Sequence, residues 1–75
     1  MNEQSHDLRA LLLQTDAEFH QLVTQHHELE DRLHELTAKP YLSQPEQVEE
    51  VTLKKRKLAL KDRMETIMRQ HRHNH

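Results

Sequence analysis

Histidine and carboxylate side chains in the first half of the chain are the ones whose spacing could bind a metal ion. His20, His27 and His34 recur every seven residues, but seven residues of helix rise about 10.5 Å, too far for two imidazoles to share one ion. A tighter set, His27, Asp31 and His34, has the spacing i, i+4 and i+7 on one side of a helix. Its nitrogen and oxygen ligands could hold Zn²⁺ weakly. We interpret this side as a solvent-exposed polar face, keep the tighter set as a weak metal candidate, and expect no cofactor.

One strongly basic run, residues 54–57 (Lys-Lys-Arg-Lys), could contact phosphate groups. Four consecutive helical residues point around about 300° of the circumference, so they do not form one patch. The only aromatic residues are Phe19 and Tyr41, which offer no platform for stacking bases beside this run. We therefore do not expect nucleic acid as the partner, and nucleic-acid binding is kept as the alternative function. Its candidate residues are Lys55, Arg56, Arg63 and Arg69.

Length and composition exclude several classes of protein. A chain of 75 residues buries only about 60% of its unfolded surface, so its core is thin and oligomerisation is expected. It has no Cys and no Gly, and 32% of its residues are charged, which is typical of long helices. The longest apolar run, residues 11–13, is far shorter than a membrane span, and residues 1–7 lack the apolar stretch of a secretory signal. We expect a cytoplasmic protein without a membrane partner.

Two long amphipathic segments, preceded by a short one, must position these side chains. Capping boxes at Thr15 with Glu18 and at Ser43 with Glu46 predict two helix starts, and Pro40 predicts a turn. The predicted fold is all-α: an antiparallel two-helix hairpin, coiled-coil-like, with a short N-terminal helix. The single small domain, 1–75, comprises a short helix at about 6–13, a long helix at about 16–38, a turn at 39–43, a long helix at about 44–70 and a frayed tail at 71–75.

Apolar residues at heptad spacing predict which sides of the two long helices meet. The last helix also carries a second apolar stripe nearly opposite the first, at 100° per residue. This second stripe consists of Val48, Val51 and Leu58, and it predicts contact with a protein partner or a second copy of the chain. The expected hairpin core consists of Phe19, Leu22, His26, Leu29, Leu33, Leu36, Leu53, Leu60, Met64 and Ile67.

His26 is a histidine at a core position of the heptad pattern, where a polar group costs stability unless it is paired. In the antiparallel register we expect His26 to lie near Lys57 and Leu60. The prediction is a partly buried side chain that forms a hydrogen bond across the hairpin and so fixes the register.

Two motifs occur in the long segments, and the second has a more specific order than a coiled coil requires. Residues 19–29 follow the pattern F-x-x-L-x-x-x-H-x-x-L, and residues 53–62 follow L-K-K-x-K-L-x-L-K-D. Together with Leu33, Met64 and Ile67, these motifs resemble the YdcH-like family of short bacterial proteins over about residues 16–69. The resemblance implies a helical hairpin, and it implies no particular biochemical activity.

A helical hairpin offers no site for catalysis, because acid–base chemistry needs titratable groups in a concave and partly dry pocket. We therefore expect neither enzymatic activity nor a small-molecule substrate. The predicted function is that of a small helical interaction module, which self-associates as a homo-oligomer or docks on a protein partner. The alternative is a nucleic-acid-associated protein that uses its basic last helix.

Overall fold

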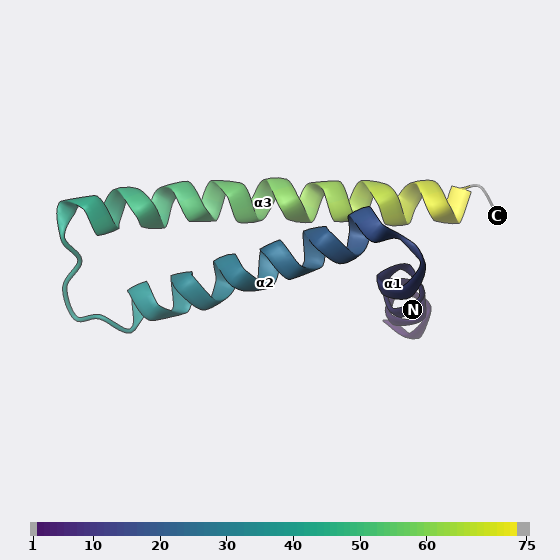
Figure 1. Ribbon diagram of the computed structural model, residues 1–75, viewed down its shortest axis with the longest axis horizontal. Helices are drawn as coiled ribbons and strands as arrows, with labels where there is room; N and C mark the ends of the chain where they lie inside the picture. The colour runs from purple at the N-terminus through teal and green to yellow at the C-terminus, as the bar shows by residue number, and fades with distance from the viewer. Residues whose placement is uncertain (1, 74–75) are drawn as a thin grey trace.

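The computed structural model describes the backbone of residues 2–73 and the side chains of residues 7–73. This part of the chain contains three α-helices and no strand: α1 (Asn2–Thr15), α2 (Ala17–Thr37) and α3 (Gln44–His73). The predicted all-α class is confirmed. α2 and α3 lie side by side, and α1 turns away at the end opposite the connecting loop (Figure 1). The molecule is elongated, with extents of 48 × 21 × 18 Å.

Three ion pairs join α2 to α3 along their length. As the residue number rises on α2, the number of the partner on α3 falls, so the two helices run in opposite directions. Surface pairs of this kind select a register more than they add stability. The pairs are Glu18 with Arg63 at 2.9 Å, Glu30 with Lys57 at 3.6 Å, and Arg32 with Glu49 at 2.8 Å.

The buried apolar side chains form two clusters, one toward each end of α2. Burying a side chain such as Leu or Phe contributes about 1.5–3 kcal/mol, so these few residues supply most of the stabilisation. The cluster near α1, called here the α1-end cluster, contains Leu12, Phe19, Met64 and Ile67. The cluster near the connecting loop, the loop-end cluster, contains Leu33, Leu36 and Leu53.

A break at Asp16 separates α1 from α2. The prediction that Thr15 caps α2 is wrong: Asp16 is the N-cap, and its Oδ1 accepts a hydrogen bond of 2.9 Å from the Phe19 N–H. The hydroxyl of Thr15 donates instead to the carbonyl of Leu11 at 2.8 Å, because Thr15 is still part of α1. The break lets α1 turn back, so that Leu12 packs in the same cluster as Phe19.

Three helix ends extend further than predicted, and one of them is the C-terminal end of α1, which lies at Thr15 rather than at about residue 13. α1 begins at Asn2 rather than at about residue 6, because Glu3 and Gln4 favour helix and Ser5 is not needed as a cap. α3 continues through His73 rather than ending at about residue 70, and its last turn is basic, as the negative end of a helix dipole favours. Residues 71–73 of the expected frayed tail are thus helical, and residues 74–75 lie outside the described residues. α2 begins one residue later and ends one residue earlier than expected.

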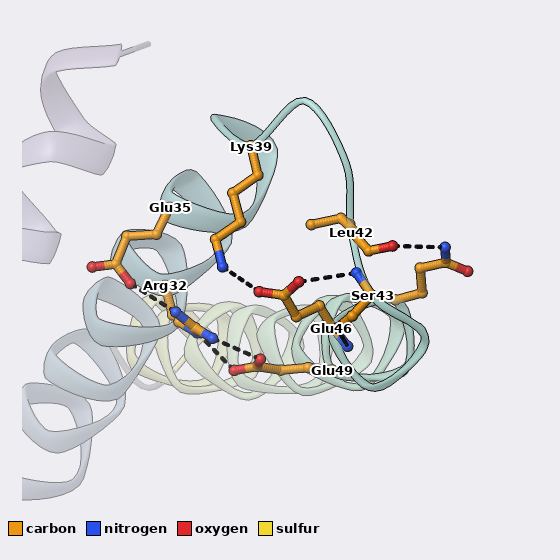
Figure 2. Close-up of polar contacts among 8 residues, drawn as sticks. Arg32, Glu35, Lys39, Leu42, Ser43, Glu46 and Glu49 are labelled. Carbon is orange, nitrogen blue, oxygen red and sulfur yellow. Dashed lines mark hydrogen bonds and ion pairs between the residues drawn. The ribbon is translucent and has the colours of Figure 1, made fainter.

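Polar contacts in the loop determine where α3 begins (Figure 2). The predicted capping box is confirmed: the Ser43 N–H donates to Oε1 of Glu46 at 2.9 Å, and the Glu46 N–H donates to Oγ of Ser43 at 3.3 Å. The ammonium group of Lys39 donates to the other carboxylate oxygen of Glu46. Glu46 therefore connects the end of α2, the loop and the first turn of α3.

Arg32 makes the second connection at this end of the molecule (Figure 2). Its Nε and Nη2 donate to both carboxylate oxygens of Glu49 at 2.8 and 2.9 Å, and its Nη1 donates to Glu35 at 3.1 Å. The two parallel hydrogen bonds fix the orientation of the Arg32 side chain relative to Glu49, in addition to the attraction between the two charges. They raise the pKa of Arg32 and lower the pKa of Glu49.

The loop contacts make folding sensitive to acid. The Lys39 ammonium, and then the backbone N–H of Ser43, lower the pKa of Glu46 from 4.5 to about 2. Because the pKa of this carboxyl group is lower in the folded state than in the unfolded state, its contacts stabilise the protein fully at pH values above the pKa of the unfolded state. This contribution is lost as the pH falls through the range from 4.5 to about 2.

We predict that Glu46→Gln lowers stability near neutral pH and flattens its decline between pH 4.5 and about 2. Urea unfolding followed by far-ultraviolet circular dichroism at a series of pH values measures both effects. Glu28→Gln is the matched control, because Glu28 is exposed and forms no ion pair among the described residues. An unchanged acid slope in Glu46→Gln would show that other carboxylates cause the decline.

Candidate functional site

α3 exposes three large apolar side chains on the side that faces away from α2. Val48 is 66% exposed, Val51 is 52% exposed and Leu58 is 59% exposed. These three residues are called the outer surface of α3. Val48 and Val51 also line a shallow groove on α3, together with Gln44, Gln47, Thr52 and Lys55.

The outer surface follows from the period of α3. Leu53 and Ile67 are buried against α2, and a rotation of 100° per residue turns Val51 and Leu58 about 140–160° away from Leu53. α2 has no comparable second stripe, and its outward residues are polar. Among residues 7–73, the other exposed large apolar side chains are Leu11 of α1 and Tyr41 of the loop, so α3 is the one element with several on one face, which is why this face is the candidate site.

Two lysines border the outer surface, and one of them, Lys54, also lines a groove with Glu30 and Leu33 of α2. Lys54 and Lys55 follow Val51 by three and four residues and precede Leu58 by the same spacings, so they share its side of the helix. Both are exposed, and neither forms an ion pair within residues 7–73. The acidic side chains nearest to this face are Glu50, one turn before Lys54, and Asp62, one turn beyond Leu58. The outer surface thus combines apolar anchors with positive charge.

The remaining basic candidates for nucleic-acid binding are not equivalent. Arg63 donates to both carboxylate oxygens of Glu18, at 2.9 and 3.1 Å. This contact raises the pKa of Arg63 and lowers the pKa of Glu18, so the guanidinium group already has an anionic partner. Lys55, Arg56 and Arg69 are exposed and have no ion pair in the described part of the chain.

The ten residues expected in the hairpin core fall into two groups by exposure. The difference follows from the shape of the contact, since only the residues at the centre of each cluster are covered from all sides. Phe19, Leu33, Leu36, Leu53, Met64 and Ile67 are buried, whereas Leu22, His26, Leu29 and Leu60 are partly buried.

His26 lies along α2 between the two clusters, and 15% of its side chain is exposed. The expected hydrogen bond from His26 to α3 is absent from the described residues. Nδ1 of His26 lies 3.4 Å from Glu30 on the same helix, and Glu30 in turn lies 3.6 Å from Lys57 on α3. The i, i+4 spacing makes Glu30 the closer partner. Nε2 of His26 is buried and has no hydrogen-bond partner among these residues.

We predict that His26→Leu stabilises the fold by about 1 kcal/mol, because a buried polar atom without a partner costs about 1–3 kcal/mol. Chemical unfolding near neutral pH measures the difference from wild type. His27→Leu provides the control, since it makes the same change at the exposed neighbouring position and leaves the stability nearly unchanged. A less stable His26→Leu would show that the contact with Glu30 outweighs the cost of the buried nitrogen.

The weak metal candidate does not form a site. Within residues 7–73, no three His, Asp or Glu side chains gather in a group that could hold a metal ion. His27, Asp31 and His34 are all exposed, and their spacing spreads them over about two turns of a convex helix surface.

A groove between α1 and the last turns of α3 was not among the sites predicted from the sequence. Arg9 lines it from α1, and Lys61, Arg69 and Arg72 line it from α3. The spacing of the α3 residues was visible as a helical stripe. The contribution of Arg9 was not, because it depends on the angle at which α1 leaves the break at Asp16. This feature is called the α1–α3 groove below.

No helix within residues 2–73 combines the length and the apolar character needed to span a bilayer. Neither a curated protein nor a solved structure gives a significant match to the chain. One family, described as a protein of unknown function (DUF465), matches residues 19–68, which include nearly all of α2 and most of α3. α1 and the last five residues of α3 lie outside the match. Because the matched segment makes up more than half of the 75 residues, the chain belongs to the DUF465 family.

Proposed function

We propose that the chain is a non-enzymatic interaction module. Its coiled-coil-like hairpin of α2 and α3 presents the outer surface of α3 to an acidic, amphipathic helix of a protein partner. One observation carries this proposal: Val48, Val51 and Leu58 are exposed together while Lys54 and Lys55 beside them have no ion pair among the described residues. Apolar anchors on one helix face, spaced by one or two turns, are what helix-to-helix docking uses.

The charge of the outer surface favours a different protein over a second copy of this chain. In a two-fold dimer the same patch meets itself, so the α3 helices of both copies would face each other. When the two α3 helices pack parallel, this brings the basic runs, residues 54–57 of each copy, close together beside their apolar anchors. Like charges at an interface oppose association, whereas an acidic partner neutralises them.

The proposal also includes a cellular location and an alternative function. The resemblance to YdcH-like proteins supports a bacterial cytoplasm as the setting. Nucleic-acid binding stays the alternative, supported by the exposed Lys55, Arg56 and Arg69, which have no ion pair among the described residues. The engagement of Arg63 by Glu18 weakens this alternative, because it removes one of the four cations that would contact phosphate.

We predict that the chain is monomeric in sedimentation equilibrium and that Val51→Glu with Leu58→Glu abolishes binding of its protein partner. The partner is captured from cells with the wild-type chain, and its acidic helical segment is then synthesised and titrated by calorimetry. Two buried carboxylates at apolar anchors cost far more than they gain, so affinity falls below detection.

Tyr41→Glu is the control, because Tyr41 is 87% exposed in the loop, outside the outer surface. This variant should bind the synthetic helix as wild type does. A wild-type dimer that the double substitution converts to monomer would replace the proposed partner with a second copy. A captured species that is nucleic acid and is lost on substitution of Lys55 and Arg56 would favour the alternative.

A further inference from the structure

The α1–α3 groove gathers a large share of the uncompensated arginines of this chain. Arg32 and Arg63 are bound to carboxylates, whereas Arg9, Arg69 and Arg72 have no ion pair among the described residues. All three of these arginines line the one groove, together with Lys61. The groove has a volume of about 330 Å³, which falls within the range of small-ligand sites, about 300–1,000 Å³.

The charges of this groove require an anion of matching size. Glu65 is the only acidic residue among its lining residues, so four cations leave three positive charges without compensation. A single phosphate group carries about −1.5 to −2 at pH 7, and two linked groups are needed to match the groove. Three of the four cations are arginines, whose planar fork donates two hydrogen bonds to one phosphate.

Two methionines form the apolar part of the groove. Met64 is 4% exposed and belongs to the α1-end cluster, and Met68 packs against that cluster. Their side chains place apolar surface of low dielectric constant beside the cations, where charge interactions are stronger than in bulk water. Methionine also adapts its shape to an occupant more readily than branched residues do.

We propose that the α1–α3 groove binds a ligand with two adjacent phosphate groups. The ligand is either free pyrophosphate or the diphosphate of a nucleotide, and the same chemistry recognises both. This site is separate from Val48 and Val51, because Arg69 lies 18 residues beyond Val51, about 27 Å along α3. Arg9, Arg69 and Arg72 lie outside the residues that match the family.

Isothermal titration calorimetry of the full chain tests the site with three probes: pyrophosphate, adenosine diphosphate and orthophosphate. Saturable binding of either diphosphate, tighter than that of orthophosphate, is expected, and the tighter of the two diphosphates identifies the source. Arg69→Gln with Arg72→Gln should weaken diphosphate binding about tenfold or more, because each substitution removes a charged, two-pronged hydrogen-bond donor to phosphate. Arg9→Gln should weaken it as well, because α1 supplies one side of the groove.

Lys54→Gln with Lys55→Gln is the matched control: it removes the same charge from the same helix, away from the groove. This control should retain the wild-type affinity. An equal loss in both double variants would show unspecific attraction to a basic helix and overturn the proposal, as would wild-type affinity in Arg9→Gln or the absence of saturable binding. Circular dichroism confirms that each variant is folded, which the exposure of the substituted α3 residues leads us to expect.

Discussion

The packing of α2 against both of its neighbours is the interaction on which the rest of the structure depends. Phe19 near the start of α2 and Leu36 near its end are both completely buried, and the contacts of α1 and α3 are made mainly with α2. The radius of gyration is 15.1 Å, whereas a compact chain of this length would have about 11 Å. The core is therefore a narrow seam along one helix. Each helix keeps most of its surface in water, which is why charged residues can make up 32% of the sequence.

Polar contacts select one arrangement among those that apolar packing alone would allow. Leucine side chains tolerate a shift of one turn, because similar residues recur at each heptad. A shift of α3 by one turn, about 5.4 Å, would separate Glu18 from Arg63 and Arg32 from Glu49 together. The loop contacts of Glu46 act in the same sense, since they fix the residue at which α3 begins. The register of α3 against α2 is therefore selected by polar contacts at the surface of the molecule.

The parts of the structure that local chemistry determines were predictable from the sequence. The class, the loop and the capping box at Ser43 follow from heptad spacing, two prolines and an S-x-x-E pattern, all of which act within a few residues. The cap of α2 was misassigned, because Thr15 and Asp16 are both good caps and the choice depends on where α1 ends. The partner of His26 and the α1–α3 groove could not be predicted, because both depend on how helices meet in space. The outer surface of α3 was predicted as a second apolar stripe. The helical period shows which residues share a face, whether or not that face packs against α2.

The division of the core at His26 means that this small chain does not have to open all at once. Amide hydrogens of α2 and α3 near Leu36 and Leu53 are protected by one cluster, and those near Phe19 and Met64 by the other. Proteins often exchange hydrogens through such cooperative units with separate free energies of opening. The outer surface of α3 begins in the unit next to the loop, and the α1–α3 groove belongs to the unit next to α1. An occupant of one site would slow exchange in its own half of the molecule and leave the other half nearly as dynamic as before.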